Sequence, residues 1–276
     1  MIPIVLVASV LGGAWLVCGV SVVSLLALRE VDRLIEAHGA IPSRWVGIAA
    51  VVSLPAVVYR GDPTELLAWV TASILAALVV ELGSGRITGA LANAAGTLFG
   101  IFYVGWLLAH VIALRHLADH PALAAQQIPG MLGMFLVITT IASTAGCDAG
   151  AYFVGRAFGR HKLSPTVSPG KSVEGALGGL CTAVAFGLIA HAVFGIESLG
   201  GVSSLVSVPV LVGLSLAVGV AGIVGDLLES LLKRDAEVKD AGTLIPGSGG
   251  VLDRIDSGLL AFPTMYYLVL VYLIWS

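Results

Sequence analysis

The residues best suited to chemistry lie between Ser230 and Asp256, where nine charged side chains interrupt an otherwise apolar chain. Asp226 ends an apolar, glycine-rich run just before this stretch. Asp253 and Asp256 are three residues apart, a spacing that places both on one face of a helix. Mg²⁺ in proteins is usually held by one or two carboxylates, with substrate phosphates and water completing its shell. We therefore expect Asp226, Asp253 and Asp256 to bind Mg²⁺, and a second cation stays open.

A glycine-rich turn, Pro-Gly-Ser-Gly-Gly from Pro246, separates these acids. Backbone amides in such a turn can cradle phosphate oxygens. A turn of this kind is more often structural, but here basic side chains flank it, and these could neutralise phosphate charge. The expected catalytic cations are Lys233 and Arg234, and the expected substrate-binding residues of this segment are Lys239, Gly247, Ser248, Gly249, Gly250 and Arg254. Lys233 also has the i, i+4 spacing of a simple helix pair with Glu229.

A second polar segment runs from Cys147 to Gly179. It carries four basic side chains, together with the hydroxyls of Ser168 and Ser172, as a triphosphate-binding surface would require. A membrane anchor without a ligand would explain the cations but not the acids among them. The expected substrate-binding residues here are Asp148, Arg156, Ser168, Lys171 and Glu174.

The elements that position these residues must be membrane helices. Hydrophobic residues make up 58% of the 276-residue chain and charged ones 11%, against about 25% in soluble domains. A membrane span needs about 20 apolar residues, and no segment alternates as a barrel strand does. The expected fold is an all-α integral membrane protein. Its eight apolar runs are 2–27, 45–59, 66–80, 87–114, 129–147, 175–196, 202–225 and 258–275, and a break near Gly96 to Gly100 would make nine.

The distribution of basic residues predicts the orientation, because loops retained in the cytoplasm are rich in Lys and Arg. With eight spans and the N-terminus outside, twelve of the fourteen basic residues lie inside, and only Arg60 and Arg115 lie outside. The polar loops 148–174 and 226–257 then emerge on the same, cytoplasmic side and form one site. We divide this single membrane domain into N-terminal helices (1–127) and a C-terminal catalytic region (128–276).

The three cysteines, Cys18, Cys147 and Cys181, lie within or at the end of apolar segments and have no paired spacing. This pattern indicates packing, not a disulfide framework or a zinc site.

The polar segments closely resemble the signature of the phosphatidate cytidylyltransferases, the CDP-diacylglycerol synthases. The resemblance covers roughly the C-terminal half of the chain. The residues that match are Ser230, Leu232, Lys233, Arg234, Lys239, Asp240, Pro246, Gly247, Gly249, Gly250, Val251, Asp253, Arg254, Ile255 and Asp256, with Asp148 to Phe153, Gly155, Arg156, Gly159, Ser168, Pro169, Lys171, Glu174 and Gly175 upstream. Ser248 stands where the family commonly has His, and Gly170 where a Lys is frequent.

The resemblance implies transfer of CMP from CTP to phosphatidic acid, giving CDP-diacylglycerol and pyrophosphate. Together with the carboxylate site and the orientation inferred above, it predicts a Mg²⁺-dependent enzyme of phospholipid synthesis in the plasma membrane, with its active site facing the cytoplasm. The expected partners are CTP, phosphatidic acid and the lipid bilayer, with no nucleic acid, and a homodimer stays open.

Three alternatives stay open at this point. Another CTP-dependent lipid enzyme, an ether-lipid cytidylyltransferase or a polyprenol kinase, would use the same phosphate chemistry. An ion-coupled transporter would place its acids near the bilayer midplane and show an inverted repeat, whereas this chain gathers its acids on one side. An inactive relative could serve as a membrane scaffold. Segment 28–44 could lie along the interface as an amphipathic helix or simply extend the first helix.

Overall fold

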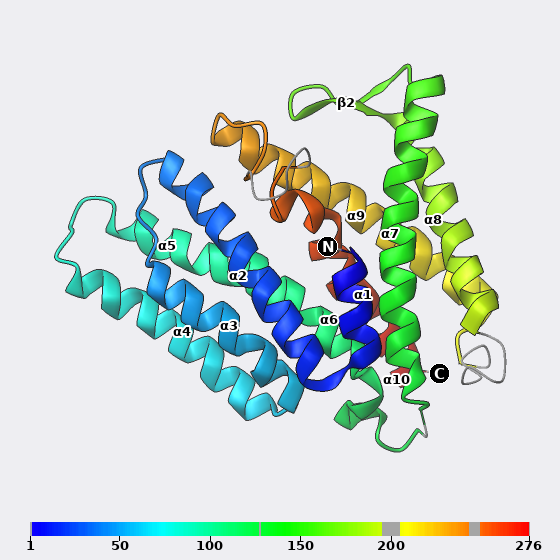
Figure 1. Cartoon of the computed structure of the whole chain (residues 1–276), viewed down its shortest axis with the longest axis horizontal. Coiled ribbons are helices and arrows are strands. Elements are labelled where there is room, and N and C mark those ends of the chain that lie inside the picture. The colour runs from blue at the N-terminus through cyan, green and yellow to red at the C-terminus, as the bar shows by residue number, and fades with distance from the viewer. Residues whose placement is uncertain (1, 127, 195–204, 243–248, 276) are drawn as a thin grey trace. The chain divides into compact units, whose positions relative to one another are not determined.

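The structure is a computed structural model that describes residues 2–126, 128–194, 205–242 and 249–275. Figure 1 shows helices throughout the described chain and one small pair of strands. The chain forms two compact units. The first consists of residues 3–113 and 232–255, and the second of residues 114–231 and 256–275. Each is described by itself below, and the predicted division at residue 127 stays a prediction.

The first unit contains the N-terminal helices. They are α1 (Ile2–Leu11), α2 (Gly13–Ala37), α3 (Arg44–Arg60), α4 (Pro63–Gly83) and α5 (Ala90–Gly100), followed by the π-helix η1 (Ile101–Trp106) and α6 (Leu107–Arg115), which ends in the second unit. Helices α2, α3 and α4 lie side by side in Figure 1. The short 3₁₀ helix η6 (Leu252–Arg254) packs against α2.

Local signals explain several of these boundaries. Gly12, with φ 65° and ψ −165°, separates α1 from α2 within the predicted span 2–27. The Asp62 side chain accepts hydrogen bonds from the amides of Thr64 and Glu65 at the start of α4. These amides, Thr64 first, hold the pKa of Asp62 below its usual value of 3.8. Asp62 is therefore the N-cap that begins α4.

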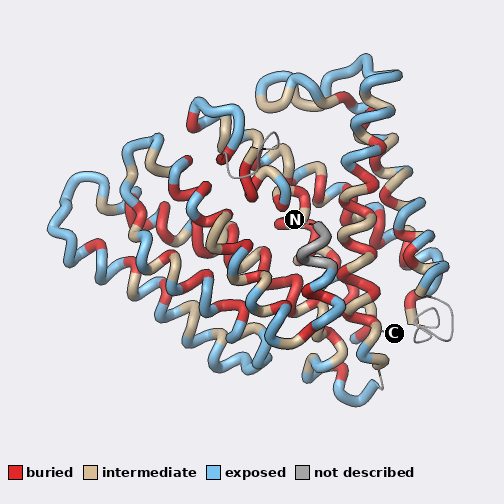
Figure 2. Tube along the Cα trace, in the orientation of Figure 1, coloured by how far each residue is buried: buried red, intermediate tan, exposed pale blue. Residues whose placement is uncertain are grey.

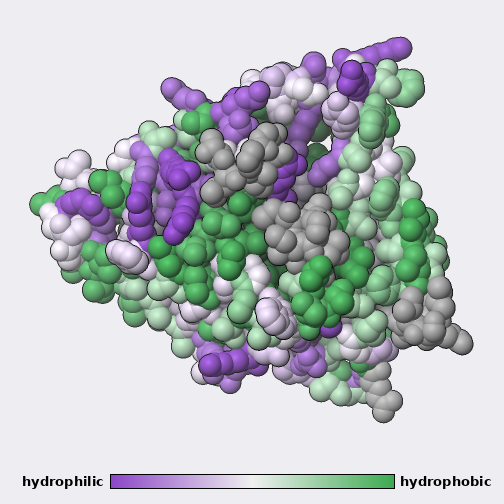
Figure 3. Space-filling view, in the orientation of Figure 1, coloured by the Kyte–Doolittle hydropathy of each residue, from purple (hydrophilic) through white to green (hydrophobic). Residues whose placement is uncertain are grey.

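The second unit contains α7 (Met131–Phe158), the strands β1 (Lys162–Ser164) and β2 (Ser168–Ser172), α8 (Val173–Phe194), most of α9 (Val208–Asp235), and α10 (Asp256–Trp275). The strands form an antiparallel hairpin in which Lys162 pairs with Ser172 and Ser164 with Ser168. Figure 2 shows buried residues recurring along α7. In Figure 3, hydrophobic side chains cover the outer surface of α7 and α8, whereas hydrophilic ones gather around the hairpin.

Helices α7 and α8 approach each other closely because small residues face one another. A Cβ added at Gly150 would collide with Thr182, and one added at Gly179 would lie 2.7 Å from the carbonyl oxygen of Cys147. The Thr182 hydroxyl donates to the carbonyl of Gly146 at 2.8 Å. The backbones are therefore close enough for a side-chain hydrogen bond from one helix to the other.

The structure confirms an all-α membrane protein. Among the described residues, seven helices are long and apolar enough to cross a membrane. The predicted span 45–59 corresponds to α3, which with 17 residues is shorter than each of these seven helices. The alternative of a break near Gly96 to Gly100, which would have made nine spans, does not occur among the described residues, because the helix passes through η1 without interruption from Ala90 to Arg115. Segment 28–37 simply extends α2.

The predicted polar loops are wrong in extent, because both begin within helices. α7 continues to Phe158 and α9 to Asp235. Hydropathy marks where a helix leaves the apolar layer, whereas backbone hydrogen bonds carry the helix further into the polar region. Asp148 and Asp226 therefore lie on helices, where neighbouring turns fix their directions.

Candidate active site

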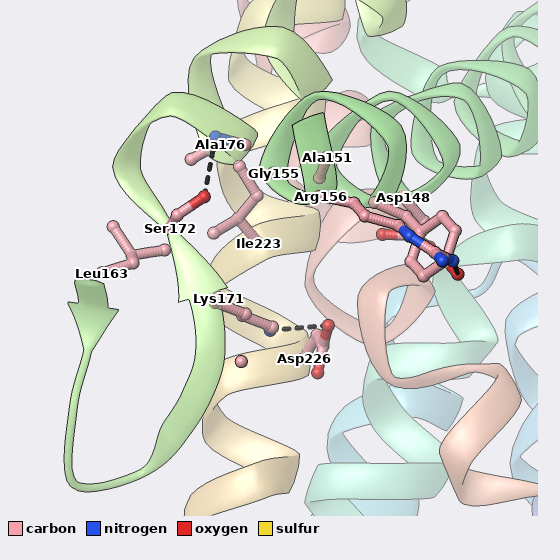
Figure 4. Close-up of a pocket in the computed structure, with 13 residues that line it drawn as sticks. Asp148, Ala151, Gly155, Arg156, Leu163, Lys171, Ser172, Ala176, Ile223 and Asp226 are labelled. Atoms are coloured by element: carbon pink, nitrogen blue, oxygen red, sulfur yellow. Dashed lines mark hydrogen bonds and ion pairs between the residues drawn. The ribbon is translucent and has the colours of Figure 1, made fainter. Parts of the chain in front are cut away.

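The second unit contains a cavity of about 380 Å³ lined by α7, the hairpin, α8 and α9. Figure 4 shows the side chains of Asp148, Arg156, Lys171 and Asp226 around it. Ser172 and Tyr152 also contribute to the lining. Predicted substrate-binding residues from one polar segment thus meet a predicted metal ligand from the other.

Lys171 and Asp226 form the central ion pair of this cavity, with the ammonium nitrogen 2.6 Å from a carboxylate oxygen. Their side chains are 25% and 31% exposed. Ser230, one turn along α9, donates to the other oxygen of Asp226 at 3.4 Å. The ammonium nitrogen itself is buried against the carboxylate. An entering phosphate could therefore take over the ammonium group only by displacing Asp226, whose carboxylate a cation could then bind.

Asp148 and Arg156 line the same cavity from α7. The Ser257 hydroxyl donates to Asp148 at 3.5 Å, and Arg156 donates to the phenolic oxygen of Tyr152 at 3.0 Å. Arg156 and Tyr152 are one helical turn apart and both are exposed. Arg156 therefore presents a guanidinium group to the cavity beside an aromatic hydroxyl.

Three carboxylates of the second unit lie close enough to share a cation. One oxygen from each of Asp226, Glu229 and Asp256 lies within 4.8 Å of the others. Glu229 follows Asp226 by three residues on α9, and Asp256 begins α10. Three carboxylate oxygens at this spacing are a suitable donor set for a hard divalent cation. Two of the three predicted metal ligands are therefore brought together, and Glu229 joins them.

Ser168 begins strand β2 of the hairpin, and Glu174 lies in the first turn of α8. Glu174 accepts hydrogen bonds from the amides of Arg160 and His161, and one of its oxygens lies 2.6 Å from Nδ1 of His161. Ser168 is half-buried at the start of β2. Glu174 thus connects the start of α8 to the residues that follow α7. Direct contact of Glu174 or Ser168 with substrate stays a prediction.

Asp253 lies in the first unit. One of its oxygens is 2.7 Å from the ammonium nitrogen of Lys233, and the other accepts from the amides of Gly250 (2.7 Å) and Ala241 (3.1 Å). Gly249 has φ 78°, a conformation that favours glycine. The signature segment is therefore organised around the Asp253 carboxylate, and direct metal binding by Asp253 stays a prediction.

The remaining predicted cations of the first unit, Arg234, Lys239 and Arg254, are exposed. Gly247 and Ser248 lie outside the described residues. Their predicted contacts with phosphate are accordingly not tested by the structure.

Sequence reasoning missed Glu229 as a member of the carboxylate group and Tyr152 as a cavity residue. The signal for Glu229 was its i, i+3 spacing from Asp226, but the same residue also suggested a pair with Lys233. It missed as well the buried polar residues of the N-terminal helices, such as Glu30 and Glu81, because those helices were judged by hydrophobicity alone.

All three cysteines are free, as predicted. Cys147 is buried, whereas Cys18 and Cys181 are exposed.

Known proteins provide an independent comparison. The sequence profile of the cytidylyltransferase family matches residues 1–272. A phosphatidate cytidylyltransferase of Haemophilus influenzae is 45% identical over 135 residues, which are 49% of this chain and 46% of that protein. A phosphatidate cytidylyltransferase of Synechocystis is 29% identical over 279 residues, covering 96% of this chain and 91% of that protein. The uncharacterized protein YnbB of Escherichia coli is 33% identical over 249 residues, covering 90% of this chain and 77% of that protein.

The chain thus aligns with about half the length of the Haemophilus influenzae protein and with most of the other two. The family profile extends through the N-terminal helices as well as both polar segments. The signature residues and the match over nearly the whole chain agree, and the chain belongs to the cytidylyltransferase family.

Proposed function

We propose that this protein is a phosphatidate cytidylyltransferase, which transfers CMP from CTP to phosphatidic acid. The family match over residues 1–272 carries the proposal. It is supported by the names of the relatives in Haemophilus influenzae and Synechocystis. The cavity adds physical support, because it combines cationic and anionic side chains as a phosphate-transfer site requires.

In this reaction a phosphate oxygen of phosphatidic acid forms a bond to the α-phosphorus of CTP. The bond from that phosphorus to the bridging oxygen of the β-phosphate breaks, and pyrophosphate leaves with that oxygen. The attacking oxygen is already anionic, so little general-base help is needed. The main tasks are to align two strongly negative groups and to neutralise their charge.

The cavity residues suit these tasks. Lys171 and Arg156 bring two positive charges to one cavity, and Ser172 adds to its lining. We assign Lys171 and Arg156 to the phosphates of CTP, and Ser168 to a supporting hydroxyl contact. Lys171 would exchange its bond to Asp226 for a phosphate oxygen. Asp148, fixed beside Ser257, would keep these cations oriented.

Asp226, Glu229 and Asp256 would hold Mg²⁺, for which their three oxygens within 4.8 Å are a fitting donor set. Bound there, Mg²⁺ would neutralise and orient phosphate oxygens. The three carboxylates also place negative charge beside Lys171, which pairs with Asp226 and is assigned to the CTP phosphates. A second cation and a metal-binding role for Asp253 belong to the same proposal.

The signature segment would supply further contacts to phosphate. Lys233, paired with Asp253, and the exposed Arg234, Lys239 and Arg254 would screen the departing pyrophosphate. The glycine-rich turn from Gly247 to Gly250, with Ser248, would donate backbone and hydroxyl hydrogen bonds to phosphate oxygens.

We further propose that the protein lies in the plasma membrane with the site facing the cytoplasm. Twelve of the fourteen basic residues fall on one side in an eight-span topology, which is the pattern of cytoplasmic loops. Phosphatidic acid would then remain in the bilayer while its headgroup meets CTP at the interface.

The test is product formation by the detergent-purified protein with CTP, phosphatidic acid and Mg²⁺. We expect CDP-diacylglycerol and pyrophosphate in equal amounts, and neither product after EDTA treatment. Asp253→Asn should abolish turnover while the protein remains inserted. Asp62→Asn is the matched control, because Asn also caps helices and Asp62 lies outside the signature.

Two results would contradict the proposal. A folded wild-type protein that consumes CTP only with a different lipid acceptor would identify another CTP-dependent enzyme. Normal turnover by Asp253→Asn would remove that carboxylate from the catalytic machinery.

A further inference from the structure

Glu30 is a fully buried carboxylate in α2, far in sequence from the signature segment. It is 0% exposed. One of its oxygens accepts a hydrogen bond from the amide of Val251 at 2.9 Å, and the other accepts from the amide of Leu252 at 2.7 Å. Burying a carboxylate is costly unless hydrogen bonds compensate it. Here the compensation comes from backbone amides of one short segment.

The glycines of the segment make this approach possible. A Cβ added at Gly242 or at Gly250 would collide with the Glu30 carboxylate. Both residues are buried. The chain on both sides of the signature turn therefore closes around Glu30, and at these two positions only a residue without a side chain fits.

The residue that follows this tethered backbone is Asp253. Its carboxylate accepts from the amides of Ala241 and Gly250 and pairs with Lys233. Glu30 and Asp253 together hold four backbone amides, those of Ala241, Gly250, Val251 and Leu252. The direction in which Asp253 points is thus fixed partly by a side chain from the N-terminal helices.

We propose that Glu30 is a positioning residue for the reaction, which holds residues 250–252 so that Asp253 and Lys233 are correctly placed. This inference rests on the proposed cytidylyltransferase function and extends it to a helix outside the signature. Glu30 does not itself contact substrate. It acts through the backbone that precedes Asp253.

The test compares Glu30→Gln with Glu81→Gln. Glu81 is a second buried carboxylate of the same unit, 6% exposed, and it is bound to Asn93 (2.8 Å) and Arg86 (3.2 Å) and not to the segment. We expect Glu30→Gln to lower kcat/KM for CTP by about tenfold or more, the usual scale for a lost hydrogen bond to a charged group. The KM for phosphatidic acid should stay within about twofold. Glu81→Gln should lower the melting temperature without changing kcat/KM per folded molecule.

A second readout needs no activity. Amide hydrogen exchange at Val251 and Leu252 should be faster in Glu30→Gln than in the wild type, and unchanged in Glu81→Gln. Gly242→Ala, which pushes against Glu30 without altering a proposed binding residue, should show the same increase. Gly83→Ala is its control, because nothing lies within 4 Å of a Cβ there.

The outcomes separate the two proposals. Unchanged exchange at Val251 and Leu252 in Glu30→Gln overturns the tether. Faster exchange with an unchanged kcat/KM for CTP overturns the positioning role. A wild-type protein that makes no CDP-diacylglycerol contradicts the proposed function instead, and the exchange measurement then still decides whether Glu30 holds the segment.

Discussion

Single carboxylates organise the polar parts of this chain, and each does so through a different kind of partner. Asp226 pairs with an ammonium group, Asp62 caps a helix, and Glu30 accepts from backbone amides. Hydrogen bonds and charges of this kind offset the cost of removing a carboxylate from water. The same residue type thus has a structural role at some positions and a proposed chemical role at others.

At the scale of single residues, His38 makes a pH-dependent contribution to the stability of the folded protein. It lies just past the end of α2, with its Nε2 2.8 Å from Asp235. The hydrogen bond to the carbonyl of Leu34 and then the charge of Asp235 raise the pKa of His38 above its usual 6.5. Protonated His38 therefore stabilises the folded protein. This contribution is fully present below pH 6.5 and is lost as the pH rises through the raised pKa.

We expect His38→Gln to lower the melting temperature below pH 6.5, with the difference from the wild type shrinking toward alkaline pH. Thermal unfolding in detergent across pH 5.5 to 9 measures this difference. Both side chains are exposed, so added salt should also reduce it. A difference that is constant with pH, or that grows as the pH rises, would contradict the assignment.

At the scale of elements, the α7–α8 pair depends on glycines that let two backbones approach. Apolar side chains alone drive little association between helices in lipid, so close packing and hydrogen bonds between helices matter more. Thr182 donates to Gly146 across this contact, and Gly150 faces Thr182. The hairpin between the two helices carries Lys171, so this packing also sets the position of a cavity residue.

Gly150→Ala should therefore destabilise the protein by about 1–3 kcal/mol, the scale of an overpacked contact. Gly213→Ala is the matched control in α9, because a Cβ there meets nothing within 4 Å. That control should be neutral or stabilise by up to about 1 kcal/mol, since Ala favours the helix. Equal effects of the two substitutions on thermal unfolding in detergent would show that α7 and α8 are not closely packed at Gly150.

At the scale of the whole molecule, the unequal distribution of basic residues predicts which ends of the helices face the cytoplasm. Lys162 in the hairpin should be cytoplasmic, and Arg60 at the end of α3 should lie on the opposite side. Both side chains are exposed. The two positions therefore report the orientation of the chain.

Single cysteines at these positions, in a background without Cys18 and Cys181, can be labelled with an impermeant maleimide. In intact spheroplasts, Arg60→Cys should react and Lys162→Cys should react only after the membrane is opened. The reverse pattern would invert the proposed orientation. Labelling of both positions in intact cells would contradict the eight-span count.

The sequence by itself determined the fold class and the family. Membrane helices follow from composition, because lipid leaves the backbone no partner other than itself. The signature residues from Ser230 to Asp256 likewise predicted the family that the profile match confirms. These properties depend on residue types and their order, which a sequence contains in full.

Only the tertiary structure decided which side chains meet. It placed Lys171 against Asp226, added Glu229 to the carboxylate group, and brought Glu30 to the amides of residues 251 and 252. Hydropathy also ended α7 and α9 too early, because it registers the apolar layer and not the hydrogen bonds that continue a helix beyond it. Contacts between residues up to 222 positions apart depend on how the helices pack, and that packing is not encoded in local spacing.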